Sequence, residues 1–200
     1  MFYKLTWSFF KIIYTVFFRL EVIGLNNIPL DKPVIIACNH ISNLDPPTIG
    51  VACKVRPVNF MAKIELFQIP VFAWAIRNLG AFPVKRGASD KNAIKTALDK
   101  LRNNLVVGIF PEGTRSKDGN LGEVGTGVMT IAAKAHAVVV PAAVSGTNKL
   151  SLTNPFPKIK VAFGEPIYLP EKIEDKEIFV EYTEKMMQQI KELLVILKKD

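Results

Sequence analysis

Cysteine and histidine are scarce in this sequence, which has two residues of each among 200. Cys38 and Cys53 lie in or beside apolar stretches, and their spacing matches no metal-binding pattern. The sequence therefore shows no sign of a disulfide scaffold. A reduced, intracellular setting is the simplest interpretation of so little cysteine.

Internal repeats, low-complexity tracts and convincing linkers are also missing. The composition is 49% hydrophobic and 22% charged, which is typical of a globular protein, and the mean hydropathy is +0.21. The length suits one full hydrophobic core better than two smaller ones. We predict one catalytic domain, residues 21–200, preceded by a separate segment, residues 1–20.

Acidic residues are absent from the first twenty positions, where eight aromatic residues gather instead. The polar positions are spaced as one stripe along a helix, and they are Lys4, Ser8, Lys11, Thr15 and Arg19. A spanning helix needs about 20 mostly apolar residues, and Lys11 would lie near its middle. A helix lying in the membrane interface is the better solution. The alternative is an amphipathic helix that packs on the protein's own core.

A secretory signal peptide is disfavoured in this segment, because Lys11 interrupts it and no small-residue cleavage site precedes Arg19. We expect a peripheral or monotopic protein on the cytoplasmic face of the cell membrane. The formal charge of +8 favours an anionic partner. Because the basic residues are dispersed and the aromatic residues gather in residues 1–20, a nucleic-acid surface is poorly supported, and we expect no nucleic-acid partner.

Short apolar runs of strand length alternate with helical patterns from residue 21 onward. The strand-like runs are Val34 to Cys38, Leu105 to Phe110, Val138 to Val144 and Ile159 to Phe163. The clearest helical patterns are Ser89 to Arg102, with Ser89 as its predicted cap, and about Lys176 to Lys198. This alternation predicts an α/β domain with a mostly parallel central sheet flanked by helices.

His40 stands just past the first apolar run, and Asp45 stands just before Pro46. Pro46 suits the first turn of a helix and Asp45 suits its cap. The turn between them would bring the Asp45 carboxylate to the His40 imidazole, fix its tautomer and stabilise the cation formed when it accepts a proton. The pair is a candidate general base, and a structural histidine at a strand end is the alternative.

A second polar cluster, residues 110–116, follows another apolar run and reads Phe-Pro-Glu-Gly-Thr-Arg-Ser. Its glycine permits a close approach of the backbone to a ligand, and its arginine can bind a phosphate with two hydrogen bonds. Ligands bind at the carboxyl ends of parallel strands. We therefore predict that the two clusters converge on one site.

These motifs resemble those of the glycerolipid acyltransferases, particularly the bacterial 1-acylglycerol-3-phosphate acyltransferases. The resemblance covers roughly residues 20 to 165, and four motifs occur in the family's order. They are Asn39-His40-x-x-x-x-Asp45, Gly80 to Arg86, Phe110 to Ser116 and Val139 to Ala142.

The resemblance implies a role for each matching residue. His40 would be the base and Asp45 its orienter, while Arg86, Glu112 and Arg115 would bind the acceptor, the two arginines at its phosphate. Lys63 also resembles a family lysine near that phosphate. Gly125 departs from the family pattern, which often has a lysine there, so a substrate contact is either missing or supplied by another residue.

The predicted mechanism is direct acyl transfer, which requires neither a metal nor a bound organic cofactor. Backbone amides near Gly113 and Thr114 are candidates for stabilising the oxyanion. A covalent acyl intermediate on Cys38 is conceivable, but a buried apolar cysteine fits its position better. We expect His136 to be structural or exposed.

The expected partners are an acyl thioester donor, either acyl carrier protein or coenzyme A, a lysophospholipid acceptor and a membrane surface. The resemblance implies transfer to 1-acylglycerol-3-phosphate. Alternatives within the family are another lysolipid or glycerol-3-phosphate as the acceptor. A noncatalytic basic module that binds membranes or nucleic acid is the alternative from another class. A serine hydrolase is disfavoured because the sequence has no G-x-S-x-G motif.

Overall fold

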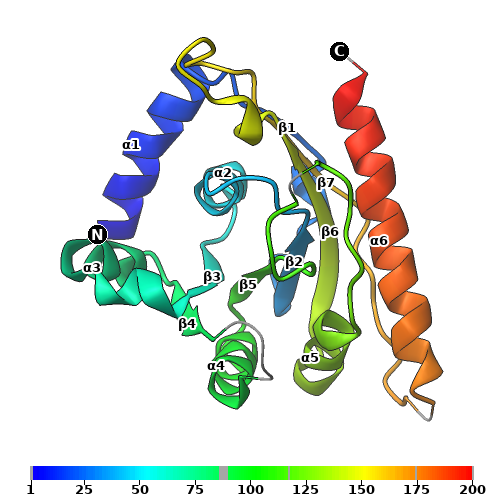
Figure 1. The fold of residues 1–200 in the computed structure, drawn as a ribbon. Coiled ribbons are helices and arrows are strands. Elements are labelled where there is room, and N and C mark those ends of the chain that lie inside the picture. The colour runs from blue at the N-terminus through cyan, green and yellow to red at the C-terminus, as the bar shows by residue number, and fades with distance from the viewer. Residues whose placement is uncertain (1, 86–89, 117, 174, 200) are drawn as a thin grey trace.

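The computed structural model describes residues 2–85, 90–116, 118–173 and 175–199 as an α/β domain in which helices cover both faces of one sheet (Figure 1). The described residues form seven strands: β1 (Glu21–Ile23), β2 (Val34–Cys38), β3 (Val58–Lys63), β4 (Phe82–Val84), β5 (Val106–Ile109), β6 (Val138–Ser145) and β7 (Lys160–Phe163). Their order is β1-β7-β6-β2-β5-β3-β4, and β7 runs antiparallel to β6 while the other pairs are parallel. The predicted fold class is confirmed.

The helices of the described residues alternate with these strands. They are α1 (Phe2–Val16), α2 (Asp45–Ala52), α3 (Pro70–Asn78), α4 (Lys91–Arg102), α5 (Gly127–Ala135) and α6 (Glu177–Lys198). Three short 3₁₀ helices join them: η1 (Leu25–Asn27), η2 (Ile64–Gln68) and η3 (Thr147–Lys149). Within the part of the chain that is described, no helix combines the length and the apolarity needed to cross a bilayer.

Strand β2 lies between β5 and β6 in the sheet and is buried on both faces. Side chains of a strand alternate between its faces. Ile35 and Ala37 therefore pack with α4, α5 and α6, whereas Val34, Ile36 and Cys38 pack with α2 on the other face. A central strand that is covered on both sides reads as a continuous apolar run, which is why the sequence predicted β2 with its correct ends.

Two helix starts differ from their predictions. The N-cap of α4 is Asp90, whose carboxylate accepts hydrogen bonds from the amides of Asn92 and Ala93. The predicted cap, Ser89, lies outside the described residues. Helix α2 begins at Asp45, so this residue occupies the first turn and Leu44 is the N-cap. The carboxylate of Asp45 turns back to the preceding loop instead of capping the helix.

Helix α1 packs on the domain along one side and leaves another side open. Tyr14 is 2% exposed, and its ring packs with Phe18 and Val51. The hydroxyl of Thr48 in α2 donates a hydrogen bond to the Tyr14 hydroxyl at 3.1 Å. Four apolar side chains of α1 are exposed, and they are Leu5, Phe9, Ile12 and Val16. The helix thus combines contact with the core and an uncovered apolar stripe.

Candidate active site

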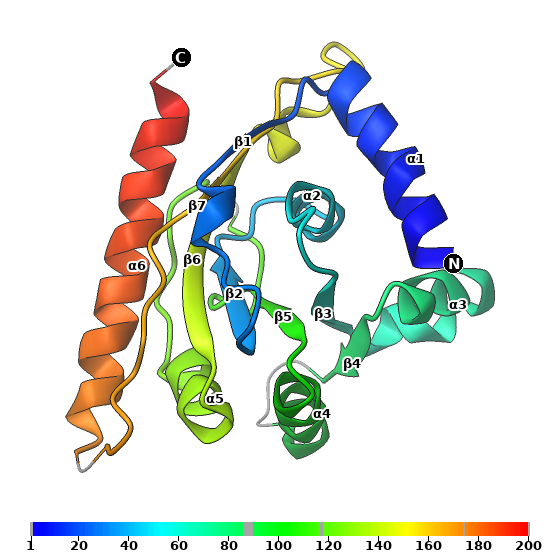
Figure 2. The same ribbon diagram turned by 180° about the vertical axis from the view of Figure 1, so that it is seen from behind.

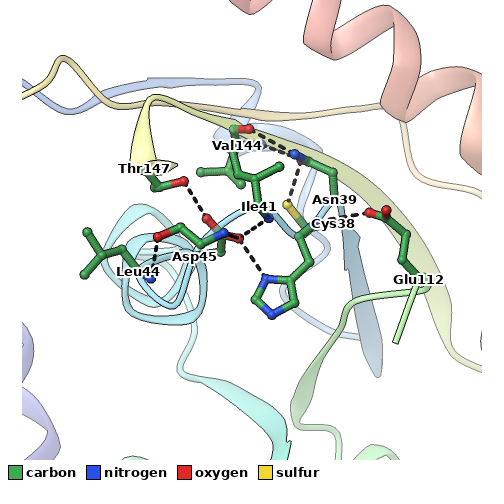
Figure 3. A network of polar contacts seen from close by, with 10 residues as sticks. Cys38, Asn39, Ile41, Leu44, Asp45, Glu112, Val144 and Thr147 are labelled. Atoms are coloured by element: carbon green, nitrogen blue, oxygen red, sulfur yellow. Dashed lines mark hydrogen bonds and ion pairs between the residues drawn. The ribbon is translucent and has the colours of Figure 1, made fainter. Parts of the chain in front are cut away.

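Three neighbouring strands end at the candidate site. Strand β2 leads to His40 and Asp45, β5 leads to the loop of residues 110–116, and β6 leads to Thr147. Because β5, β2 and β6 are adjacent and parallel, their carboxyl ends lie along one edge of the sheet. Figure 3 shows residues from all three strand ends in one network of polar contacts. The two clusters that are about 70 residues apart in sequence meet here.

His40 and Asp45 form a buried pair. The Nδ1 atom of His40 lies 2.8 Å from Oδ2 of Asp45, and the two residues are 5% and 0% exposed. The carboxylate accepts hydrogen bonds, so the Nδ1 nitrogen carries the proton in the neutral ring. The Nε2 nitrogen is then the one that can accept a proton from a substrate.

The carboxylate of Asp45 is held by several donors besides the histidine. Its Oδ2 atom accepts hydrogen bonds from the amides of Ile41 at 2.6 Å and Ser42 at 2.7 Å. Its Oδ1 atom accepts one from the Thr147 hydroxyl at 2.6 Å. The first turn of α2 also favours a negative charge. These donors supply the hydrogen bonds that a fully buried carboxylate needs and fix which oxygen faces His40.

The loop after β5 fixes the backbone of His40. The backbone amide of His40 donates a hydrogen bond to Oε1 of Glu112 at 3.1 Å, and the carbonyl of His40 accepts one from the amide of Ser116 at 2.8 Å. The other oxygen of Glu112, Oε2, accepts from the amide of Gly122 at 3.1 Å. Glu112 therefore ties together two loops at the site. Its role in binding the acceptor stays a prediction.

The imidazole of His40 is also supported through its face. Its ring stacks on Phe110 with centroids 4.1 Å apart, and Phe110 stacks on Phe60 at 5.8 Å. Phe60 lies over Gly108 in β5, where a Cβ atom would come within 2.3 Å of its ring. The glycine thus makes room for the aromatic pair that fixes the plane of the imidazole.

Asn39 joins the exit of β2 to the end of β6. Its side-chain nitrogen Nδ2 donates to the carbonyl of Val144 at 3.1 Å, and its Oδ1 atom accepts from the Val144 amide at 2.8 Å. Beyond Val144, Gly146 has a φ of 86°, and a Cβ there would lie 2.1 Å from the carbonyl oxygen of Lys158. This tight turn delivers Thr147 to Asp45.

The predicted acceptor-binding residues occupy more open positions than the pair of His40 and Asp45, which we call the dyad. The Lys63 side chain is 47% exposed and pairs with Glu65 at 3.4 Å. Gly113, Thr114 and Arg115 are exposed on the loop after β5, and Gly113 has a φ of 66°. Arg86 lies outside the described residues. The structure therefore brings Glu112 to His40, while the roles of Lys63, Gly113, Thr114 and Arg115 stay predictions.

A cavity of about 340 Å³ lies beside this loop. Its lining includes Glu112 and Thr114 together with the acidic residues Asp118 and Glu123. Carboxylates repel a phosphate, so this cavity is a poor phosphate site. Gly125 has open space around it, since a Cβ there would meet no atom within 4 Å.

The two cysteines and the second histidine lie apart from this chemistry. Cys38 is 1% exposed, and burial raises the pKa of its thiol well above the usual range. Burial also raises the pKa of Cys53 to about 11. A protonated thiol is a weak nucleophile, which argues against a covalent route. His136 is exposed at the end of α5, where it adopts a φ of 49°, in agreement with the structural or exposed position expected of it.

Sequence reasoning missed Thr147, Phe60 and the linking role of Glu112. Thr147 lies 102 residues after Asp45 and belongs to none of the recognised motifs. A small signal for it was present, since Gly146 and Thr147 directly follow the strand-like run that ends at Val144. The stacking of Phe60 depends on pairing between β3 and β5, which local sequence does not reveal.

The geometry is that of an α/β fold with a histidine held by a buried aspartate at the carboxyl edge of the sheet, an arrangement that can accept a proton from an alcohol. The sequence profile of the Acyltransferase family matches residues 19–145. The chain belongs to this family, and it is an acyltransferase of the lysophosphatidic acid acyltransferase kind.

Relatives of known name support this assignment. A 1-acyl-sn-glycerol-3-phosphate acyltransferase of Bacillus subtilis is 33% identical over 193 residues, which are 96% of each chain. The chloroplastic enzyme LPAT1 of Arabidopsis thaliana is 38% identical over 140 residues, 68% of this chain but 39% of the plant protein. The crystal structure of PlsC, the 1-acyl-sn-glycerophosphate acyltransferase of Thermotoga maritima, matches with a TM-score of 0.78 at 30% identity, covering 99% of this chain and 80% of that one.

Proposed function

We propose that the protein transfers a fatty acyl group from an acyl thioester to the free hydroxyl of 1-acylglycerol-3-phosphate, giving phosphatidic acid in phospholipid biosynthesis. The observation that carries this proposal is the 2.8 Å contact between Nδ1 of His40 and Oδ2 of Asp45 at the carboxyl edge of the sheet. The names of the Bacillus and Thermotoga relatives supply the acceptor.

In the proposed reaction the Nε2 atom of His40 accepts the proton of the acceptor hydroxyl as its oxygen attacks the thioester carbonyl. The new C–O bond forms a tetrahedral intermediate, the C–S bond then breaks, and the leaving thiolate takes the proton back from the imidazolium. Asp45 stabilises the imidazolium between the two steps. The backbone amides of the exposed residues Gly113 and Thr114 are our candidates for the oxyanion. The amide of Gly113 donates to the carbonyl of Phe110 at 3.0 Å, so it would have to exchange this partner for the substrate.

The acceptor phosphate is expected to bind the cations that the motifs predict for it. Lys63, the last residue of β3, and Arg115, on the loop after β5, are both exposed, and β3 and β5 are neighbouring strands. Arg86 remains a candidate from its motif. An arginine can bind phosphate oxygens through two parallel hydrogen bonds, which gives orientation as well as attraction.

The acceptor is a lipid, so the proposal includes a peripheral position on the cytoplasmic face of the membrane. Helix α1 exposes a stripe of four apolar residues: Leu5 at 62%, Phe9 at 61%, Ile12 at 63% and Val16 at 64%. Lys11 and Arg19 are exposed on the same segment. Apolar and basic side chains on one helix suit the interface of an anionic bilayer. Residues 1–20 would be the membrane segment and residues 21–200 the catalytic domain.

The proposal is tested by offering the purified protein a panel of acceptors with each donor type. The acceptors are 1-acylglycerol-3-phosphate, glycerol-3-phosphate and lysolipids with choline, ethanolamine or glycerol headgroups, and the donors are acyl carrier protein and coenzyme A thioesters. Mass spectrometry identifies the products. We expect phosphatidic acid to form fastest. Preferred acylation of another acceptor would contradict the assignment, and no acyl transfer at all would favour the noncatalytic alternative.

A further inference from the structure

The segment from η2 to α3 exposes an apolar surface that the proposed reaction does not use. We call its residues 64–78 the η2–α3 segment. Four of its apolar side chains are widely exposed: Ile69 at 55%, Val71 at 81%, Phe72 at 45% and Trp74 at 58%. Within α3, all of whose residues are described, Ala73 is the buried one. Such a concentration of exposed apolar surface marks an interaction site.

The net positive charge of the chain is concentrated in two segments. Residues 1–20 have three basic and no acidic side chains, and residues 46–89 have six basic side chains and one acidic. These two segments account for the whole formal charge of +8, and the remaining residues balance to zero. The same two segments hold the exposed apolar faces of α1 and α3. The coincidence points to one partner that is both apolar and anionic.

Some of these cations lie close to the exposed apolar surface. Lys63 directly precedes η2, and Arg77 in the last turn of α3 lies over the ring of Phe67. Lys85 is exposed just after β4, whose last residue, Val84, pairs with Lys63 in the sheet. Arg56 is used inside the fold, where it donates to the carbonyls of Pro29 and Lys32, so it does not contribute to this surface.

Helix α3 lies beside the N-terminal end of α1. Both views of the ribbon show these two helices next to each other on the side of the molecule away from α6 (Figures 1 and 2). The two exposed apolar faces therefore belong to neighbouring helices. The carboxyl end of β3, with Lys63, leads directly into η2, which places a predicted phosphate ligand next to this surface.

We propose that the η2–α3 segment is a second membrane contact, which binds the interface of an anionic bilayer together with α1. The inference rests on the proposed function in one respect, that the acceptor is a membrane lipid. Trp and Val side chains of α3 enter the interface, and Lys63, Arg77 and Lys85 attract the headgroups. Two contacts fix the tilt of the domain relative to the bilayer, which one helix alone would not. They hold the side of the site that carries Lys63 and Arg115 towards the lipid.

Other partners fit this surface less well. A second copy of the chain would bring two basic surfaces together, and the like charges would repel. Nucleic acid would attract the cations but would leave the aliphatic side chains of Ile69 and Val71 without a suitable contact. A bilayer accepts both kinds of side chain at once.

Flotation of the full chain with vesicles tests the proposal. The variant Val71→Glu with Trp74→Glu changes two exposed residues of α3, and the matched control, Val180→Glu with Val195→Glu, changes two residues of α6 that are 50% and 52% exposed. The vesicles contain equal parts of phosphatidylglycerol and phosphatidylcholine. We expect the α3 variant to lose about tenfold in vesicle affinity, because two introduced charges are repelled by an anionic surface, and the α6 control to bind like the parent.

A separate assay with detergent-dispersed 1-acylglycerol-3-phosphate distinguishes this inference from the proposed function. If the parent shows no turnover there, the proposed function fails, while the flotation result still decides the membrane contact. The inference is overturned if the α3 variant floats like the parent, if the α6 control loses as much affinity, or if size exclusion shows a dimer that only the α3 variant disrupts.

Discussion

The two sides of the candidate site are built in opposite ways. On the dyad side, Asp45 is 0% exposed and accepts hydrogen bonds from three other groups besides the histidine. On the acceptor side, Lys63 and Arg115 are exposed. In the proposed mechanism the groups that transfer protons are fixed before substrate arrives, whereas we expect the exposed groups predicted to bind the phosphate to become ordered by the ligand.

This difference follows from the cost of burying charge. A carboxylate that loses its water needs replacement donors, and Asp45 obtains them from a turn, a helix terminus and the end of β6. A phosphate brought by a lipid carries its own charge, so the cations that receive it can stay hydrated until binding. Mutations on the two sides should therefore alter different kinetic constants.

Removing the Thr147 hydroxyl sharpens the comparison on the dyad side. In Thr147→Val we expect kcat to fall by about tenfold or more, because a hydrogen bond to a charged group contributes about 1.5–3 kcal/mol, while KM for the acceptor stays unchanged. The matched Thr147→Ser variant should retain most of the rate. Steady-state kinetics checks both values, and a serine variant as slow as the valine variant would show that the hydroxyl is not what matters.

Removing the Arg115 side chain tests the acceptor side. We expect Arg115→Ala to raise KM for 1-acylglycerol-3-phosphate by about tenfold with little change in kcat, since lost uniform binding alters KM alone. Arg102, an exposed arginine of α4 that pairs with Asp99 at 3.5 Å, supplies the control variant Arg102→Ala. If Arg115→Ala lowers kcat as strongly as a dyad variant does, the two sides are not distinct.

Filling Gly108 tests the aromatic support of His40. In Gly108→Ala the new methyl group would meet the Phe60 ring, so we expect a loss of about 1–3 kcal/mol in the free energy of unfolding and a lower kcat. Gly127→Ala is the control, because a Cβ there would meet no atom within 4 Å. Chemical denaturation measures the difference, and equal stability of the two variants would refute the proposed crowding.

Removing the Cys38 thiol should have the smallest effect. We expect Cys38→Ala to keep its kcat within about twofold of the parent, since burial raises the pKa of this thiol and keeps it in the unreactive form. Treatment of the folded parent with a thiol-alkylating reagent at neutral pH should likewise leave turnover intact. Trapping of an acyl group on Cys38 during turnover would instead establish a covalent intermediate.

Local patterns predicted the parts of the fold that depend on local burial. Strand β2 and helix α6 were placed almost to the residue, because one is buried on both faces and the other repeats its apolar positions at helical spacing. Strands β1 and β4 have three residues each and lie at the edges of the sheet. Runs this short have too little hydrophobic pattern to be recognised.

The features of the candidate site also divide into those that local sequence predicted and those that it did not. Asp45 follows His40 by five positions, so residue order alone indicated that the two side chains meet. Thr147 reaches Asp45 only because β6 pairs with β2, and this pairing depends on the whole sheet. The resemblance predicted that Glu112 binds the acceptor, which stays a prediction. The hydrogen bonds that Glu112 accepts from the amides of His40 and Gly122 are seen only in the structure.

The most direct test of the account is the rate of acyl transfer in His40→Ala, measured with saturating thioester and 1-acylglycerol-3-phosphate. We expect kcat to fall by about 10²–10⁴-fold, the usual contribution of a positioned general base, while circular dichroism and thermal unfolding show a folded protein. Asp45→Asn should reproduce much of that loss. A folded His40→Ala variant that transfers acyl groups at close to the parent's rate would contradict the role of the imidazole as the base.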